Sequence, residues 1–291
     1  MKRRFLALGI CFVGAVGLAR AEEPRAERPR AGATPVARPC GKTPAGMACV
    51  PGGEYQRGSD TGLKDERPAH RVWVDTFYMD LYEVTHAEYQ ACVKAGACEK
   101  AGPKYRAGAG YKGFSEPKQP VVGVSWFNAR QYCQSKGKRL PTEAEWEKAA
   151  RGTDGRTYPW GNERCTCARA IIMDLKGRGC GVGKEGRGAT WDVGSRPPGP
   201  YGLYDMAGNS WEWVADWYSP SYAACGKECE GPNPKGPCGG ADECPGHRLK
   251  IVKGGSWYWP ASDARAARRR PHVPLNRPFH HFGFRCAKSV E

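Results

Sequence analysis

The stretch YGLYDMAGNSWEWVADWY, which runs from Tyr201 to Tyr218, is the most informative segment of this 291-residue chain. Within it, Asp205 and Glu212 stand seven residues apart, with Gly208 between them. Calcium takes several hard oxygens from carboxylates and backbone carbonyls, and a glycine lets a chain curl tightly enough to supply them from one short segment. Two carboxylates at this spacing are weak support for a metal loop by themselves. In the alternative, Asp205 caps a turn and Glu212 pairs with a buried arginine.

Six further blocks frame this stretch, and each taken alone is only a turn or a capped helix. They are MACVPGGEYQRGSD from Met47, ERPAHRVWVDTFYMDLYEVTHAEYQACV from Glu66, RLPTEAEWEKAARG from Arg139, YPWGNE from Tyr158, KGGSWYW from Lys253 and FGFRCA from Phe282. Together and in this order, the blocks closely resemble the formylglycine-generating, or sulfatase-modifying, enzyme family over residues 47–289. The resemblance implies a compact, irregular α+β fold related to C-type lectins, with few regular elements.

Local signals independently predict helices at 85–96, 125–137 and 142–152. A serine or threonine precedes each apolar stripe, and a glycine ends each helix. In the first and third helices, a glutamate three residues after the threonine makes a capping box. Val-rich and Ile-rich runs predict strands at 71–75 and 249–252. With 39 glycines and 24 prolines, the rest is expected to be rich in loops, which is compatible with the implied α+β fold.

The resemblance implies calcium binding by the 201–218 stretch. Two side chains and two backbone carbonyls would serve as its ligands: Asp205 and Glu212, then Gly208 and Ser210. A second calcium site of the family aligns with Glu185 and with the carbonyl of Arg187. There, Ile171 stands where the family has an asparagine ligand, and an apolar side chain offers no oxygen. We therefore expect calcium at the first site and a damaged second site.

The resemblance also shows what this chain lacks. In the family's enzymes, two cysteines shortly after a Gly-Gly-Ser turn bind copper(I) and activate oxygen to oxidise a substrate cysteine, a task that suits soft sulfur ligands. Here the segment reads GGSWYWPASDARAARRR, which places Trp259 and Ala264 at the cysteine positions. Neither side chain binds copper, so copper is not expected and catalysis is left open. Ser256 matches a family active-site serine, or serves only as a turn residue.

A basic and aromatic segment follows the same turn. In this family the neighbouring surface forms a substrate-peptide groove, so the segment predicts a site for an anionic peptide or glycan. Its members are Ser256, Trp257, Tyr258, Trp259, Arg265, Arg268, Arg269 and Arg270. The alternative is a solvated arginine face, with at least one of the aromatic rings buried in the core.

Fourteen cysteines indicate an oxidising compartment and a disulfide framework. The resemblance pairs Cys133 with Cys286, while short spacings suggest Cys92 with Cys98 and Cys40 with Cys49. Four cysteines in a Gly/Pro-rich insertion at about 219–250 allow three pairings, with zinc binding as an alternative: they are Cys225, Cys229, Cys238 and Cys244. Among the remaining three, Cys165, Cys167 and Cys180, one is expected to be left over.

The N-terminus indicates export. Residues 1–21 have the charged start, short apolar run and small-residue end of a signal peptide, and 22–39 form a Pro/Ala/Arg-rich tether ahead of a domain at 40–291. We expect a secreted or periplasmic protein without a transmembrane segment. The formal charge of +15 favours anionic surfaces. Nucleic acid is not expected as a partner of an exported protein.

Two functional hypotheses follow. In the first, the chain is a non-oxidase binding or scaffold version of the fold, with a calcium-stabilised loop and a groove for an extracytoplasmic polypeptide or anionic glycan. In the second, it is a formylglycine-generating oxidase, or another protein-modifying enzyme, that uses a divergent site. An iron-dependent branch of the family carries its ligands on an additional helical domain, for which this chain has no room. His272, His280 and His281 offer a further metal cluster, with scattered surface histidines as the alternative.

Overall fold

The computed structural model describes residues 35–101, 113–174, 179–180, 188–275 and 280–290. The three predicted helices are present as α1 (His86–Lys94), α2 (Trp126–Ser135) and α3 (Glu143–Arg151). Each begins with a capping box, including one at α2 that Ser125 forms with Asn128. Because the caps satisfy backbone N–H groups that a helix leaves unpaired, these local signals were enough to locate all three helix starts.

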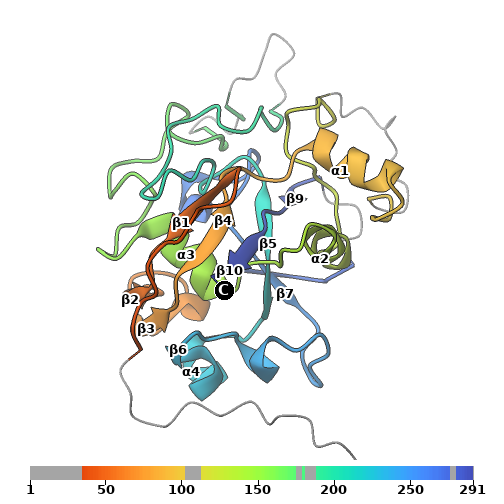
Figure 1. The fold of residues 1–291 in the computed structure, drawn as a ribbon. Helices are drawn as coiled ribbons and strands as arrows, with labels where there is room; N and C mark the ends of the chain where they lie inside the picture. Colours follow the sequence, from red (N-terminus) through yellow and green to blue (C-terminus); the bar gives the residue numbers. More distant parts are fainter. Residues whose placement is uncertain (1–34, 102–112, 175–178, 181–187, 276–279, 291) are drawn as a thin grey trace, which may run out of the picture. The chain divides into compact units, whose positions relative to one another are not determined.

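The strands are short and form three small sheets (Figure 1). The first sheet has the order β1-β4-β10, from Met47–Val50, Phe77–Asp80 and Ala287–Ser289. The second has the order β2-β3-β6, from Gly53–Arg57, His70–Val74 and Gly231–Pro232. The third has the order β8-β7-β5-β9, from Arg270–His272, Lys250–Lys253, Trp211–Trp217 and Phe282–Gly283. The predicted strands correspond to β3 and β7.

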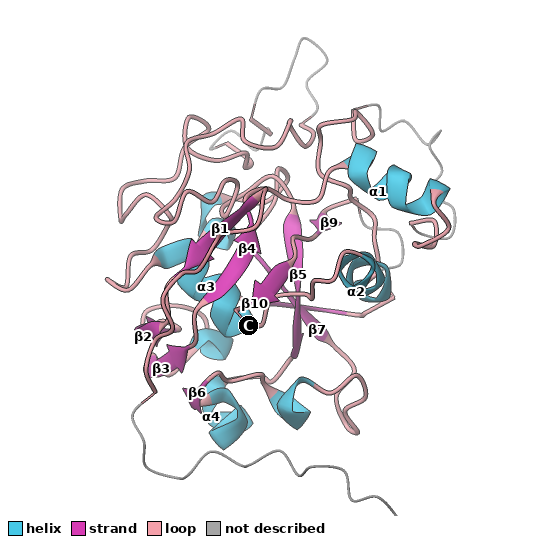
Figure 2. Cartoon of the chain, viewed as in Figure 1, coloured by secondary structure: helices cyan, strands magenta, loops and turns pink. Residues whose placement is uncertain are grey.

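Short helical turns and long loops make up most of the remainder (Figure 2). The turns are η1 (Lys64–Glu66), α4 (Tyr222–Cys225), η2 (Gly226–Cys229), η3 (Pro237–Gly240) and η4 (Ala261–Ala264). This mixed, irregular architecture is the α+β fold that the sequence predicts. Residues 35–291 form one compact unit, and Arg38, in the expected tether, already donates a hydrogen bond to the carbonyl of Val290.

Strand β5 lies at the centre of the fold, because both α2 and α3 contact it. Trp126 of α2 donates from Nε1 to the carbonyl of Val214 at 2.9 Å, and Trp146 of α3 donates from Nε1 to Glu212 Oε2 at 2.8 Å. Trp211 and Trp213 of β5 are themselves fully buried. The strand therefore places the second half of the 201–218 stretch in the core, and the 205–210 loop before it is also buried.

Helix α3 also carries buried charge. Glu143 accepts from Arg57 at 2.6 Å and from Arg269 at 2.7 Å, and Glu147 pairs with Lys253 at 3.2 Å. All five side chains are at most 1% exposed. Burial of an ion pair is tolerated only when its geometry and hydrogen bonds are nearly complete, so this network fixes α3 against β2 and β7.

Six disulfides staple the described chain. The structure joins Cys133 of α2 to Cys286 before β10, and Cys92 to Cys98 at the end of α1. The other bridges are Cys40–Cys49, Cys167–Cys180, Cys225–Cys229 and Cys238–Cys244. Cys165 is the free cysteine among the described residues, and it is buried. The four cysteines of the insertion thus form two short-range disulfides, so none of them is free to bind zinc as a thiolate.

Candidate functional site

The 205–212 loop and the Gly-Gly-Ser turn lie together. Gly208 N donates to the carbonyl of Gly254 at 2.8 Å, Asn209 N to that of Ile171 at 2.8 Å, and Trp257 N to that of Asn209 at 3.1 Å. Gly208 has φ +81°, and an added Cβ would lie 2.4 Å from the carbonyl oxygen of Ile171. Only glycine fits this close approach, so the backbone itself holds the two segments side by side.

Three buried carboxylates gather beneath this loop. Glu212 accepts hydrogen bonds from Nε and Nη2 of Arg285, each at 2.7 Å. Asp205 Oδ2 accepts a hydrogen bond from Gly194 N at 2.6 Å. Glu83 Oε1 accepts from the backbone N and the Oγ of Ser210 at 2.9 and 2.6 Å. The sequence reasoning missed Glu83; its signal was an acid inside the apolar run MDLYEV.

Ionisation of this cluster is unfavourable. Burial, followed by the neighbouring charges of Asp205 and Glu212, raises the pKa of Glu83 well above its usual range. Burial likewise raises the pKa of Asp205 to about 6. Arg285 is the fully buried cation of the cluster in the described residues, and Glu212 already holds its fork. In the described ranges, no three His, Cys, Asp or Glu side chains, this cluster included, are arranged as they would be to hold a metal ion.

The donor set fits a hard cation in part. No hydrogen bond among the described residues uses Asp205 Oδ1 or the carbonyl oxygens of Gly208 and Ser210. Against this, Glu212 pairs with a buried arginine, as in the alternative to a calcium site, and one oxygen of Asp205 accepts from Gly194 N of an earlier segment. Asp205, Gly208 and Ser210 would hold a calcium ion, with one remaining Glu212 lone pair available.

The proposed second calcium site is only partly described. Glu185 and Arg187 lie outside the described residues. Ile171 is 1% exposed and packs in an apolar cluster with Trp257 and Ala264. Its side chain therefore serves the core, while its carbonyl accepts from Asn209.

The sequence model of the family described as Sulfatase-modifying factor enzyme 1-like domain matches residues 33–290. The chain belongs to this family. Bovine formylglycine-generating enzyme is 32% identical over 303 residues, covering 88% of this chain and 77% of the bovine protein. The serine/threonine-protein kinase pkn1 of Chlamydia pneumoniae is 35% identical over 264 residues, covering 84% of this chain and 38% of the kinase. This chain thus covers well under half of the length of that kinase.

Two further similarities bear on activity and fold. The mouse protein named inactive C-alpha-formylglycine-generating enzyme 2 is 29% identical over 290 residues, covering 84% of this chain and 86% of that protein. The solved structure of PvdO from Pseudomonas aeruginosa is 28% identical with a TM-score of 0.66, covering 84% of this chain and 94% of PvdO. No helix in the described ranges is both long and apolar enough to span a bilayer.

Trp259 and Ala264 occupy the two positions that the resemblance aligns with the copper-binding cysteines. Trp259 is partly buried against the cluster around Trp211 and Trp213, with the Arg270 guanidinium 4.1 Å from its ring centroid. Ala264 is fully buried, and an added Cβ on Gly255 would lie 3.0 Å from its Cα. The two side chains belong to different apolar clusters, so each residue is part of the packing.

Three arginines of the run behind the turn are paired within the protein, while Arg270 lies over the Trp259 ring. Arg265 makes a bidentate pair with Glu66 at 2.6 and 2.7 Å, and Arg268 donates to Asp263 at 2.9 Å. Arg269 is fully buried on Glu143. In place of a solvated basic face, these residues hold the turn to η1 and α3, because the fold brings acids from distant segments to them.

The aromatic part of the predicted groove is divided between core and surface. Trp257 is 5% exposed, whereas Tyr258 is 53% exposed. Ser256 is fully buried, and its Oγ has no hydrogen-bond partner among the described residues. Trp257 packs against the rings of His280 and His281. Tyr258 is thus the residue of this segment that offers most contact area to a partner.

One thiol remains near the position of the lost pair. Cys165 lines a cavity of about 850 Å³ together with Pro260, Ala261 and Ser262, the residues between the two former cysteine positions. Burial raises the pKa of this thiol to about 12, so it stays protonated at neutral pH. A protonated, single thiol is a poor nucleophile and a poor copper ligand.

The three C-terminal histidines pack with aromatic rings. His280 and His281 lie 4.2 Å apart between centroids, and His272 lies 4.4 Å from Phe282. Burial lowers the pKa of His281 to about 3. No group of three metal-ligating side chains occurs in the part of the chain that the structure describes, which leaves the histidine metal cluster unsupported there.

Proposed function

We propose that this chain is an exported, non-oxidase member of its family that binds an extracytoplasmic polypeptide. The proposal rests on Trp259 and Ala264, which stand where the resemblance places the family's two copper-binding cysteines. Both side chains pack in or against apolar clusters, and neither offers a sulfur ligand. Loss of both thiolates removes the basis of copper(I) selectivity. The exposed ring of Tyr258 beside the Gly-Gly-Ser turn supplies flat contact area of the kind enriched at binding surfaces.

Calcium completes the proposal as a structural cation. Bound by Asp205 and its neighbouring carbonyls, it would offset the charge of Glu83, Asp205 and Glu212. Since the same loop is hydrogen-bonded to Gly254 and Trp257, a cation that rigidifies the loop also fixes the Gly-Gly-Ser turn. The chain's disulfides are compatible with an exported protein.

The second hypothesis, a divergent enzyme, centres on Cys165 and its cavity. To separate the two, the copper-treated protein is incubated with a sulfatase-type cysteine peptide in oxygenated buffer, and peptide mass and aldehyde formation are followed. We expect no copper-dependent turnover. Multiple turnovers would refute the non-oxidase assignment, and their loss in Cys165→Ser would place the chemistry at that thiol.

Binding is tested separately with the same peptide carrying serine in place of cysteine. Tyr258→Ala should weaken the interaction in calorimetry, whereas Phe127→Ala, which removes another exposed aromatic ring, on α2, should not. Equal affinities of wild type and Tyr258→Ala would remove this surface from the proposal.

A further inference from the structure

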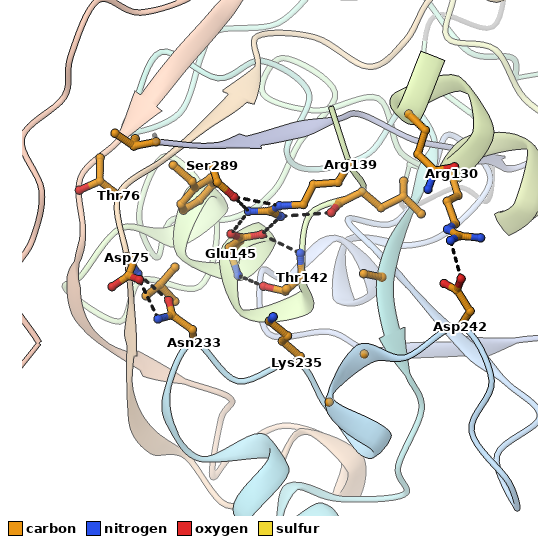
Figure 3. A pocket seen from close by; sticks show the side chains of 18 of the residues that line it. Asp75, Thr76, Arg130, Arg139, Thr142, Glu145, Asn233, Lys235, Asp242 and Ser289 are labelled. Carbon is orange, nitrogen blue, oxygen red and sulfur yellow. Dashed lines mark hydrogen bonds and ion pairs between the residues drawn. The ribbon is translucent and has the colours of Figure 1, made fainter. Parts of the chain in front are cut away.

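A second cavity, of about 510 Å³, lies between the Cys-rich insertion and the start of α3 (Figure 3). Its volume falls within the ~300–1,000 Å³ of typical small-ligand pockets. Seven parts of the chain line it: the segment at Arg38, the β3–β4 turn, α2, residues 139–145, Ala215 of β5, the insertion and the end of the chain at Ser289 and Val290. It shares no lining residue with the Gly-Gly-Ser turn or the calcium loop, so it is a separate candidate site.

The insertion wall of this cavity is pinned at both ends. Asn233 accepts from Asp75 N at 2.8 Å and donates to Asp75 Oδ2 at 2.9 Å, which joins the insertion to the β3–β4 turn. At the other end, Asp242 pairs with Arg130 of α2. The bridges Cys225–Cys229 and Cys238–Cys244 shorten the intervening loops. A pre-formed wall reduces the ordering cost of ligand binding.

The acids of the cavity already have partners. Glu145 holds Arg139 in a bidentate pair at 2.6 Å, Asp75 holds Asn233, and Asp242 holds Arg130.

The unused hydrogen-bonding groups of the cavity are therefore mostly N–H donors of its basic side chains. Lys235 has no ion pair or side-chain hydrogen bond in the described residues, and Figure 3 shows it extending toward the start of α3. Arg38 uses one guanidinium nitrogen, on the carbonyl of Val290, and Arg130 uses one, on Asp242. Three cations with unused N–H groups thus project from three walls, which favours a ligand with more than one anionic group.

The floor of the cavity is apolar. Val74, Phe77, Leu140 and Trp126 line it but are at most 3% exposed, so they support the floor from beneath. Half-buried Ala215 and the methylene stems of Lys235 and Arg130 offer apolar contacts for the C–H faces of a sugar ring. The hydroxyl oxygens of the sugar accept from Gln134 and the spare arginine donors.

We propose that the Cys-rich insertion builds a binding site for a carboxylated oligosaccharide, with Lys235, Arg38 and Arg130 receiving its carboxylates. The chain stays basic without the predicted signal peptide, with 41 Lys and Arg against 30 Asp and Glu or a formal charge of +11, which draws such a polyanion to the protein. The site is independent of the non-oxidase assignment, because neither Trp259 nor Ala264 contributes to it.

Calorimetry of the full chain with trigalacturonate tests the site. Charge-assisted hydrogen bonds contribute ~1.5–3 kcal/mol, so Lys235→Glu should weaken binding about tenfold or more. Lys227→Glu is the matched control, since Lys227 is an exposed lysine of the same insertion that does not line the cavity. It changes the net charge equally and should lower affinity only slightly. Unchanged melting temperatures would show that both variants are folded.

Three results would overturn the proposal. The first is absence of trigalacturonate binding by wild type. The second is equal weakening by both lysine variants, which would indicate a general charge effect. The third is equal or tighter binding of neutral maltotriose or of tetraglutamate, which would exclude an acidic sugar as the preferred ligand. If Tyr258→Ala abolishes trigalacturonate binding while Lys235→Glu does not, the sugar binds beside the Gly-Gly-Ser turn. That result would refute the cavity as the binding site and leave the proposed function in place.

Discussion

Removal of the Cys133–Cys286 disulfide should destabilise the fold far more than removal of Cys92–Cys98. The first bridge spans 153 residues and the second only 6. In the chain-entropy account, closing these loops in the unfolded state contributes about 5 and about 2 kcal/mol, respectively. All four cysteines are buried, so Cys→Ala double variants lose similar packing in the two cases. The expected difference between the variants is therefore about 3 kcal/mol.

The long bridge has a second, local consequence. Cys286 follows Arg285, whose guanidinium neutralises Glu212 in the carboxylate cluster. A C-terminal segment that is no longer tied to α2 would hold this arginine less firmly against three buried acids. The Cys133→Ala/Cys286→Ala variant should therefore depend on calcium more strongly than wild type does.

Urea unfolding at pH 7, with linear extrapolation, measures both variants, and non-reducing peptide mapping first establishes the pairing. A free thiol at either Cys133 or Cys286 in the wild type would contradict the pairing itself. Equal losses of unfolding free energy in the two double variants would refute the loop-length reasoning, because packing losses alone would then account for the effect.

Three other predictions concern charge. Chelation of calcium should lower the melting temperature of wild type but not of Asp205→Ala, since a ligand of the native state stabilises it by mass action; an unchanged wild-type value would show that no structural calcium is bound. Arg265→Ala should lower the free energy of unfolding by about 2–4 kcal/mol, because Glu66 is left buried and unpaired. The double variant Arg265→Ala/Glu66→Gln should regain part of this loss. A loss near zero in urea unfolding would mean that the pair does not stabilise the fold. Burial lowers the pKa of Lys148 to about 8, so the unfolded state binds more protons between pH 8 and 10.5 and this group makes stability rise with pH there. Lys148→Met should show a smaller rise than wild type between pH 7 and 9.5, and identical pH profiles would contradict the assignment.

Much of the architecture follows from short-range sequence signals. The caps at Thr85, Ser125 and Thr142 define three helix starts because each is satisfied within four residues. The strands at β3 and β7 were visible as short β-branched runs. The order of the seven blocks also gave the family, and with it the replaced residues at Trp259 and Ala264.

The partners of the charged residues could not be obtained in this way. The run RAARRR predicts an anionic-ligand site or a solvated basic face, yet Arg265 meets Glu66 and Arg269 meets Glu143 across more than a hundred residues of chain. Glu83 and Arg285 carried no local pattern that linked them to the 205–212 loop. An ion pair depends on which distant segments come into contact, and a periodicity argument does not contain that information.

The sequence by itself determined the family, the helix starts and the absence of the copper-binding thiols, because each depends on residue identity or on neighbours within one helical turn. Only the tertiary structure decided that Arg265 and Arg269 pair with distant buried acids, that Glu212 holds the buried Arg285, and that the insertion forms a cavity with α2 and α3. Burial and long-range pairing set the energy of each charge, and both exist only once the chain has folded.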